Sequence, residues 1–433
     1  MTYQEALQYL YDRLPVFHHV GGNAYKPGLQ NTIRLLDALQ HPQKNFLTIH
    51  VAGTNGKGSV SHFLAAVLQS AGYKTGLYTS PHLVDFGERI RVNGKMIDRD
   101  YVIRFTEENV ALFDDIQPSF FEATMAMAFQ YFSDSKVDIA VIETGLGGRL
   151  DSTNIIEPLV SVITNISFDH VGFLGDTLEK IAYEKAGIIK RETPAVIGEW
   201  TPETLAVFQN KAAEVNATLF FPDKIVSFDQ YTDGKMLVNL SDGTKLISGL
   251  CGDYQLKNIA TTLKTVEVLN AELPQGCEKI ENPELLDGLK YVCELTGLEG
   301  RWQQLATKPL VIADTGHNVA GITYVVEQIK RQQFHRLHIV IGMVNDKDIS
   351  SVLNLLPKEA IYYFTNAAIP RALPAEDLQK LAADFHLTGF AFDSVETALI
   401  NALQNATPDD FIFIGGSNFV VGEAISYFHS ISS

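Results

Sequence analysis

The chain has 433 residues, 46% of them hydrophobic and 20% charged, and a formal net charge of −17. This length exceeds one ordinary hydrophobic core, so we expect two or three domains of a globular protein. The negative charge argues against nucleic acid or an anionic membrane as a partner, and an anionic substrate must be attracted by local features such as Lys57, an arginine or a metal ion.

The start of the chain has neither a basic segment nor an apolar core, and no apolar run is long enough to span a bilayer. Three cysteines, Cys251, Cys277 and Cys293, lack metal-like spacing. Their odd number is typical of reduced thiols. We therefore expect a cytoplasmic protein with no membrane segment.

A glycine loop stands between a strand and a helix near the N-terminus. Apolar residues at 46–51 predict a strand, and the pattern over 59–70 predicts a helix. Such a loop lets backbone N–H groups and the helix dipole bind phosphate, and its lysine adds a full charge. An ordinary strand-to-helix turn is the alternative if the loop is taken alone. The candidate phosphate-binding residues are Gly53, Thr54, Asn55, Gly56, Lys57, Gly58 and Ser59.

Further strand-like and helical patterns alternate along the first two thirds of the chain. Strands are predicted at 75–78, 137–142, 159–163 and 195–197, and helices at 120–132 and 178–189. This alternation predicts a mainly parallel sheet covered by helices. Between 224 and 248, Asp-Gly turn dipeptides separate short strands, which predicts a small antiparallel sheet.

Polar residues follow several of these strands, where open α/β sheets bind their ligands. Ser80 follows the second strand, Glu143 follows an apolar strand, and His170 lies beyond the next one. A carboxylate at such a strand end can hold Mg²⁺ opposite a phosphate loop, although it can also be a solvated acid. Lys185 lies among apolar helix neighbours, where a snorkelling side chain is the ordinary interpretation.

A second series of strands and helices begins after the glycine-containing turn at 296–300. Its strands are predicted at 310–313, 337–341, 361–364 and 411–414. We therefore predict an ATP-binding domain over 1–296 and a Rossmann-like C-terminal α/β domain over 297–433. Arg301 lies in the interdomain turn, and Asp314 and His317 follow the first strand of the second series.

Taken together, these motifs resemble folylpolyglutamate synthase and the related bifunctional dihydrofolate synthase, in the superfamily of the Mur ligases. The resemblance runs through the glycine loop, Thr79-Ser80-Pro81-His82-Leu83, the segment 143–154, Asp169-His170, Glu184-Lys185-Ala186-Gly187, Gly300-Arg301, the segment 314–318 and Asp346-Lys347-Asp348. It implies ATP-driven amide synthesis, in which a folate-type carboxylate is phosphorylated by ATP and L-glutamate then displaces phosphate. Dihydropteroate or a reduced folate would be the acceptor, and we expect a monomer.

The resemblance also implies roles for the residues. The glycine loop would bind ATP, with Lys57 on the terminal phosphates. Mg²⁺ would be held by Ser80, Glu143 and His170, and Lys185 would match a lysine that is carbamylated in the superfamily. Arg301, Asp314 and His317 would close over the nucleotide, and Phe121 and Asp151 would lie near the pterin. The catalytic residues would be Lys57, His170 and Lys185.

Several alternatives remain at this point. The Ser80–Leu83 motif is more similar to bifunctional enzymes, so we expect both activities, and an enzyme that only extends the glutamate chain is the first alternative. A Mur-type amino-acid ligase with another carboxylate acceptor is the second alternative. One that acts on a UDP-muramoyl substrate would carry a further N-terminal domain of about a hundred residues before the loop, but the loop begins at Gly53. A noncatalytic nucleotide switch would not need Glu143, His170 and Lys185 together. A dinucleotide-dependent oxidoreductase would need a Gly-x-Gly-x-x-Gly motif after 310–313, where none occurs.

Overall fold

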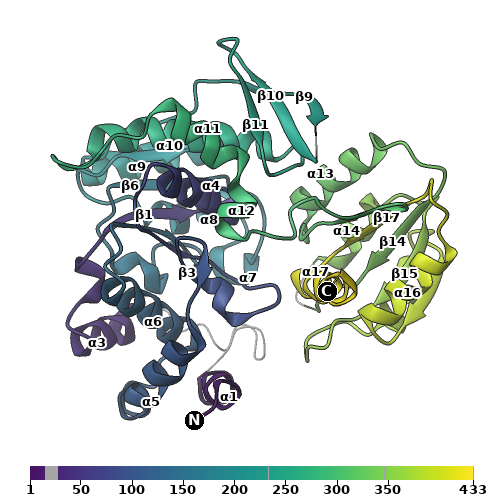
Figure 1. Cartoon of the computed structure of the whole chain (residues 1–433), viewed down its shortest axis with the longest axis horizontal. Coiled ribbons are helices and arrows are strands. Elements are labelled where there is room, and N and C mark those ends of the chain that lie inside the picture. Colours follow the sequence, from purple (N-terminus) through teal and green to yellow (C-terminus); the bar gives the residue numbers. More distant parts are fainter. Residues whose placement is uncertain (15–27, 233, 346–347, 433) are drawn as a thin grey trace. The chain divides into compact units, whose positions relative to one another are not determined.

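The computed structural model describes residues 1–14, 28–232, 234–345 and 348–432, and the chain forms two compact units. Unit 1 comprises Met1–His82, Phe86–Gly249 and Tyr254–Leu298, and unit 2 comprises Leu83–Asp85, Leu250–Asp253 and Glu299–Ser433. Figure 1 labels many of the elements of both units.

Unit 1 is built on a twisted, mainly parallel sheet. Within the described residues it has eight strands in the order β4-β3-β2-β5-β1-β6-β7-β8, of which β3 and β4 run antiparallel to their neighbours. The strands are β1 Leu47–Ala52, β2 Thr75–Tyr78, β3 Ile90–Val92, β4 Lys95–Met96, β5 Ile139–Glu143, β6 Val160–Ile163, β7 Ala195–Ile197 and β8 Leu219–Phe220. The central strands β5, β1 and β6 are almost wholly buried, as expected of parallel strands covered on both faces.

Helices cover both faces of this sheet. Apolar side chains of α1, α3, α5 and α6 pack with β2 and β5 in one core, and α4 packs against α10, α11 and the sheet on the other side (Figure 1). The helices of unit 1 are α1 Tyr3–Arg13, α3 Gln30–Ala38, α4 Lys57–Ser70, α5 Arg99–Ile116, α6 Phe120–Asp134, α7 Val171–Leu174, α8 Leu178–Ala186, α9 Pro202–Val215, α10 Gln255–Glu272, α11 Asn282–Lys290 and α12 Val292–Thr296. Short 3₁₀ turns lie at Pro42–Lys44, Phe86–Arg89 and Ser152–Ile155.

A small antiparallel sheet follows the eight-stranded one, as the sequence predicts. It has the order β11-β10-β9, with β9 at Val226–Thr232, β10 at Lys235–Leu240 and β11 at Lys245–Ser248. Alternate residues of β10 are buried, which is the period of a sheet with one face on a core.

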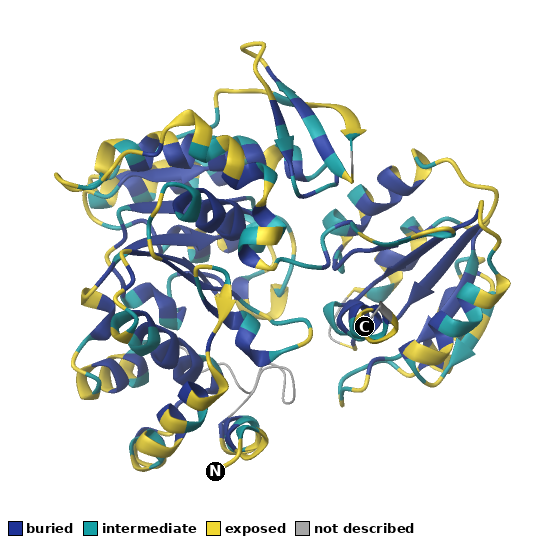
Figure 2. Cartoon of the chain, in the orientation of Figure 1, coloured by how far each residue is buried: buried dark blue, intermediate teal, exposed yellow. Residues whose placement is uncertain are grey.

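Unit 2 is a second α/β layer structure. Its sheet has the order β12-β13-β17-β14-β15-β16, parallel except for β12. Alternate strand residues face two separate cores, one formed with α13, α14 and α15 and one with α16 and α17. Figure 2 shows the buried strands between more exposed helices. The elements are β12 Gln303–Thr307, β13 Leu310–Ala313, α13 Val319–Lys330, β14 Leu337–Ile341, α14 Ile349–Leu355, β15 Ile361–Thr365, α15 Ala375–Ala383, β16 Gly389–Phe392, α16 Val395–Asn405, β17 Phe411–Gly415 and α17 Asn418–Ser432.

The predicted fold class is therefore confirmed, and the differences are local. Helix α8 ends at Ala186, three residues before the predicted end. Gly187 is the reason, because a Cβ there would lie 2.3 Å from the Cα of Arg149, so the chain turns where only a glycine fits. No helix of the described residues is long and apolar enough to cross a membrane.

Candidate active site

The glycine loop connects β1 to α4, and two of its glycines are required by their surroundings. Gly56 has φ +85°, and a Cβ there would lie 2.3 Å from Oδ1 of Asn258. Gly53 has φ +150°, and a Cβ there would lie 1.9 Å from Oγ1 of Thr164. Helix α4 begins directly at Lys57. The loop therefore presents backbone N–H groups at a helix N-terminus, which is the geometry that binds phosphate.

The segment after β6 holds this loop in place through hydrogen bonds. The backbone N–H of Asn55 donates to Oδ1 of Asn165 (2.9 Å), and the N–H of Thr54 donates to the Asn165 carbonyl (2.9 Å). Oγ1 of Thr164 donates to the carbonyl of Asn55 (2.6 Å), and Oγ1 of Thr54 bonds to the backbone of Ser167. The loop is thus ordered by a neighbouring strand end as well as by its own glycines.

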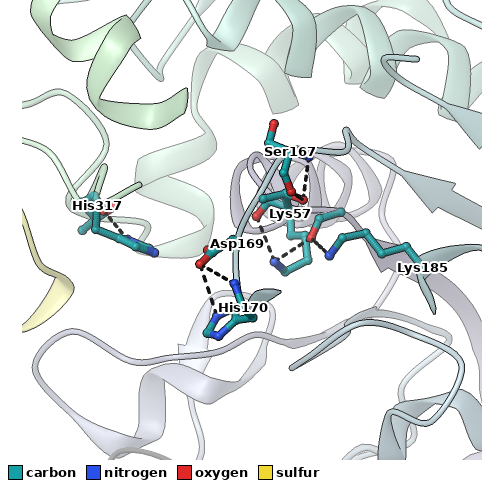
Figure 3. A network of polar contacts seen from close by, with 9 residues as sticks. Lys57, Ser167, Asp169, His170, Lys185 and His317 are labelled. Atoms are coloured by element: carbon teal, nitrogen blue, oxygen red, sulfur yellow. Dashed lines mark hydrogen bonds and ion pairs between the residues drawn. The ribbon is translucent and has the colours of Figure 1, made fainter. Parts of the chain in front are cut away.

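Two lysines meet beneath the loop. Nζ of Lys185 donates to the carbonyl oxygen of Gly53 (2.8 Å), and Nζ of Lys57 donates to the same oxygen (3.0 Å) and to the carbonyl of Thr54 (3.3 Å) (Figure 3). Lys185 is only 4% exposed. Burial and the nearby charge of Lys57 hold the pKa of Lys185 well below its usual value. The amine of Lys185 is therefore far more readily deprotonated than that of a surface lysine.

Two predicted metal ligands lie at the same edge of the sheet. Tyr78 of β2 pairs with Ile142 of β5, so Ser80 and Glu143 both lie just beyond the last paired positions of adjacent parallel strands. Val51 of β1 pairs with Glu143, which places this carboxylate beside the strand that leads into the phosphate loop. Adjacent strands are about 4.8 Å apart.

The donor set at this edge fits a hard divalent cation. Glu143 supplies a carboxylate and Ser80 a hydroxyl, and oxygen ligands of this kind suit Mg²⁺. Within the described ranges, no three His, Cys, Asp or Glu side chains gather as a metal site. Of the predicted ligands, only Glu143 and His170 are of these residue types. A Mg²⁺ site needs few protein ligands, because phosphate oxygens and water usually complete its coordination.

His170 lies at the start of α7, with φ +49°. Its backbone N–H donates to Oδ1 of Asp169 (2.9 Å), and its Nε2 lies 3.9 Å from the same oxygen. Figure 3 shows these two side chains together, in the same view as Lys57 and Lys185. The positive φ of a non-glycine residue is uncommon outside functional segments and tight turns. The register of the sheet does not fix the distance from His170 to Glu143, so its role as a metal ligand stays a prediction.

The two residues predicted near the pterin have different environments. Phe121 lies over the turn after β5, because a Cβ on Gly145 would lie 2.6 Å from its ring, and it packs against Tyr78 (ring centroids 5.8 Å apart). Asp151 is 4% exposed, and its carboxylate accepts hydrogen bonds from within the chain. Contact of either residue with a pterin stays a prediction.

In unit 2 the structure brings together the three residues predicted for the nucleotide. The carboxylate of Asp314 accepts from the N–H of Trp302 (2.8 Å) and of Gly316 (2.7 Å), just after β13. The guanidinium of Arg301 donates to the hydroxyl of Thr315, and Nδ1 of His317 lies 2.9 Å from the Thr315 carbonyl. Their contact with a nucleotide stays a prediction. Asp346 and Lys347, which carry part of the resemblance, lie outside the described residues.

Several residues that support the phosphate loop carry no clear signal in the sequence. Asn165 and Ser167 bond to the loop directly, and only their position after a strand could have indicated this. At the start of α10, Nε2 of Gln255 donates to Oγ of Ser59 (3.1 Å), and Asn258 donates to Oε1 of Gln255 (2.8 Å). The Gln255–Ser59 contact joins residues 196 positions apart, so no local pattern marks it.

Comparison with known proteins defines the class to which this architecture belongs. The Mur ligase middle domain matches residues 51–266, and the glutamate ligase domain of Mur ligases matches residues 300–418. These two domains identify a Mur-type ligase.

Relatives of known sequence and structure narrow this class. Dihydrofolate synthase/folylpolyglutamate synthase of Bacillus subtilis is 35% identical over 97% of this chain and 95% of its own length. An Escherichia coli FolC structure in complex with DHPP and ADP superposes with a TM-score of 0.84 at 31% identity, covering 100% of this chain and 99% of that one. A bifunctional folylpolyglutamate synthase/dihydrofolate synthase with Mn, AMPPNP and L-glutamate bound gives a TM-score of 0.82 at 31% identity, with 99% and 98% coverage. The chain therefore belongs to the folylpolyglutamate synthase/dihydrofolate synthase family of Mur ligases, which confirms the resemblance.

Proposed function

We propose that this protein is an ATP-dependent ligase that joins L-glutamate to dihydropteroate and to the γ-carboxylate of reduced folates. The geometric observation that carries the proposal is the pair of lysines on the Gly53 carbonyl, at the foot of a phosphate loop and beside the Glu143 strand end. Relatives with 95% or more of their length matched carry these activities in their names, and related structures hold ADP, AMPPNP, Mn and L-glutamate.

The reaction proceeds in two steps. A carboxylate oxygen of the folate-type substrate forms a bond to the γ-phosphorus of ATP, and ADP leaves, which gives an acyl phosphate. The amine of L-glutamate then attacks the acyl carbon, loses a proton and displaces inorganic phosphate, which leaves an amide. Such phosphoryl transfer needs positioning and charge neutralisation more than covalent participation of the protein.

The residues of unit 1 supply these requirements. The N–H groups at the start of α4 bind the phosphates, and Lys57 leaves the carbonyls of its own loop to contact the terminal phosphates. Mg²⁺ would be held by Ser80, Glu143 and His170, and it supplies charge neutralisation between the phosphates and the incoming carboxylate. The hydrogen bonds from Thr164 and Asn165 fix the loop before substrate binds, which lowers the cost of ordering it.

Lys185 supports a further feature of the mechanism. A buried amine with a lowered pKa is nucleophilic, and it can form a bond from its nitrogen to the carbon of CO₂ with loss of a proton. The carbamate so formed is an anion, whereas a free ammonium would repel a divalent cation at the same edge of the sheet. We therefore propose that Lys185 acts as a carbamylated lysine.

The proposal includes both activities, because the Ser80–Leu83 segment resembles that of bifunctional enzymes. The substrates are small molecules, and the strongly negative chain offers no general attraction for nucleic acid. None of the three cysteines, all of which the structure describes, forms a disulfide, which fits a cytoplasmic location.

The test is a phosphate-release assay with ATP, Mg²⁺ and L-glutamate, run separately with dihydropteroate and with tetrahydrofolate. Mass spectrometry of the products should show the addition of one glutamate residue to each acceptor, and omission of L-glutamate should abolish product. Turnover with tetrahydrofolate alone would leave an enzyme that only extends the chain. No product with either acceptor, in a protein that still binds ATP, would refute the folate assignment.

A further inference from the structure

A series of hydrogen-bonded, buried polar groups links β1, the strand before the phosphate loop, to the turn after β5. Nε2 of His50, in the middle of β1, lies 2.8 Å from Oγ1 of Thr153. Oγ1 of Thr153 in turn donates to Oδ1 of Asp151 (2.5 Å). His50 and Thr153 are 0% exposed and Asp151 is 4% exposed.

The direction of each hydrogen bond follows from the number of protons available. The Thr153 hydroxyl has one proton and gives it to the Asp151 carboxylate, so it must accept from N–H at Nε2 of His50. His50 is then the neutral tautomer with no proton on Nδ1, and this buried nitrogen has no hydrogen-bond partner among the residues the structure describes. Burial, together with the charge of Lys190, lowers the pKa of His50 to about 3, which keeps the ring neutral.

At its other end, this series of hydrogen bonds reaches the glycine-rich turn after β5. Oδ2 of Asp151 accepts from the backbone N–H of Gly145 (2.9 Å) and of Leu146 (2.8 Å). Gly145 is the second residue after Glu143, so these bonds fix the backbone that carries the Glu143 carboxylate. The N–H of Thr153 donates to Oδ1 of Asp151 as well (3.0 Å), so the carboxylate has four donors inside the protein.

The same turn also contacts other parts of the candidate site. A Cβ on Gly145 would lie 2.6 Å from the Phe121 ring, and one on Gly148 would lie 3.0 Å from the carbonyl of Lys185. The N–H of Arg149 donates to the carbonyl of Glu184 (2.7 Å), the residue before Lys185. A displacement of the turn would therefore disturb Glu143, Phe121 and the end of α8 together.

We propose that His50 and Thr153 are positioning residues, which act through Asp151 to hold the turn after Glu143 in its productive geometry. They touch no substrate; they place the groups that do. For its kinetic consequences this inference rests on the proposed function, whereas its structural consequences do not.

The principal test is Thr153→Val, which removes the hydroxyl and retains the shape of the side chain. Because a hydrogen bond to a charged group is lost, we expect amide hydrogen exchange at Gly145 and Leu146 to become about ten-fold faster or more. With ATP, Mg²⁺, L-glutamate and folate saturating, kcat should fall about ten-fold while the affinity for an ATP analogue changes less than about two-fold. Thr153→Ser, which retains the hydroxyl, should restore both properties.

A matched control removes a buried hydroxyl elsewhere in unit 1. Thr265 is 0% exposed, and its Oγ1 donates to the carbonyl of Thr261 within α10 (2.8 Å). Thr265→Val should leave exchange at Gly145 and Leu146 unchanged. Equal effects of Thr265→Val and Thr153→Val, or no effect of Thr153→Val on the two amides, would overturn the inference. A different outcome is also informative. If Thr153→Val speeds exchange at Gly145 and Leu146 but the wild-type protein makes no glutamate-containing product, the proposed function is refuted and the positioning role of Thr153 is retained.

A second measurement needs no variant. Histidine-selective ¹⁵N labelling of the wild-type chain reports the tautomer of each ring from its nitrogen chemical shifts. We expect His50 as the neutral tautomer protonated at Nε2 throughout pH 5 to 8. A neutral ring protonated only at Nδ1 could not donate from Nε2 to Thr153, and a charged ring at neutral pH would contradict the neutral tautomer. Either result would overturn the inference.

Discussion

Lys57 and Lys185 donate to one and the same acceptor, the carbonyl oxygen of Gly53, at 3.0 and 2.8 Å. Burial disfavours the charged form of Lys185, and the nearby charge of Lys57 disfavours it further. This explains why the pKa of Lys185 is well below its usual value. Lys57 lies on the same carbonyl oxygen, at the foot of the loop that would bind phosphate.

The lowered pKa of Lys185 predicts reaction with CO₂. In ¹³C-bicarbonate at neutral pH, the wild-type protein should give a carbamate resonance, because the neutral amine is the form that attacks CO₂. Surface lysines remain protonated at this pH and should contribute little. Lys185→Gln should lose the resonance and nearly all turnover. The same carbamate intensity in this variant would show that another amine reacts, and would remove Lys185 from the mechanism.

Lys57 should matter for catalysis more than for folding. Lys57→Met retains most of the side-chain stem and removes the charge, so we expect kcat to fall about 100-fold or more, as when one preorganised charge donor is removed from a reacting group. The midpoint of urea unfolding should change little, because the Lys57 bonds to its own loop are replaceable. Lys180→Met, which breaks an exposed pair with Asp176, provides the matched control and should retain turnover. Near wild-type turnover of Lys57→Met would contradict the assigned role.

If His170 binds Mg²⁺, its removal should weaken the binding of the metal ion. His170→Ala should raise the Mg²⁺ concentration at half-maximal turnover about 10- to 100-fold, and excess Mg²⁺ should recover part of the activity. Titration with Mn²⁺ followed by electron paramagnetic resonance measures the same loss without turnover. His335→Ala, which removes a mostly exposed imidazole in unit 2, should leave the Mg²⁺ dependence unchanged. An unaltered Mn²⁺ affinity in His170→Ala would exclude this imidazole as a ligand.

The elements that the sequence predicts well are those whose signal is local. The run before Gly53 alternates little and is strongly apolar, and β1 is indeed a central strand buried on both faces. Strand β16 was not predicted, because its residues are partly exposed at the sheet edge and carry no clear period. The sequence pattern extends α8 beyond its observed end, because the close approach of Gly187 to Arg149 is a tertiary contact that no local pattern marks.

In the candidate site, too, features with a local sequence signal can be predicted and features that depend on tertiary contacts cannot. The sequence places Ser80 and Glu143 at the ends of predicted strands, and the register shows that these strands, β2 and β5, are adjacent and parallel. The support of the loop by Asn165 and Gln255 could not be predicted, because each contact depends on how distant segments pack. Asp151 is the clearest case. Its motif marked it as a candidate for substrate binding, while its four internal donors emerge only from the folded chain.

His50 gives the last prediction, a dependence of stability on pH. An unfolded histidine has a pKa near 6.5, whereas burial lowers the pKa of folded His50 to about 3. Between these values the unfolded chain binds a proton that the folded chain does not, so the free energy of unfolding decreases as pH falls through this window and is unaffected by His50 above it. From pH 7 to pH 5 the loss from this residue is about 2 kcal/mol.

His50→Gln isolates this contribution, because its amide can still donate to Thr153 but does not titrate. Urea unfolding of both proteins at pH 7 and pH 5 measures it, since every other titrating group is shared and cancels in the difference. The wild type should lose about 2 kcal/mol more than the variant between the two pH values. Parallel losses in the two proteins would mean that His50 is protonated in the folded chain, which is incompatible with its complete burial in the middle of β1.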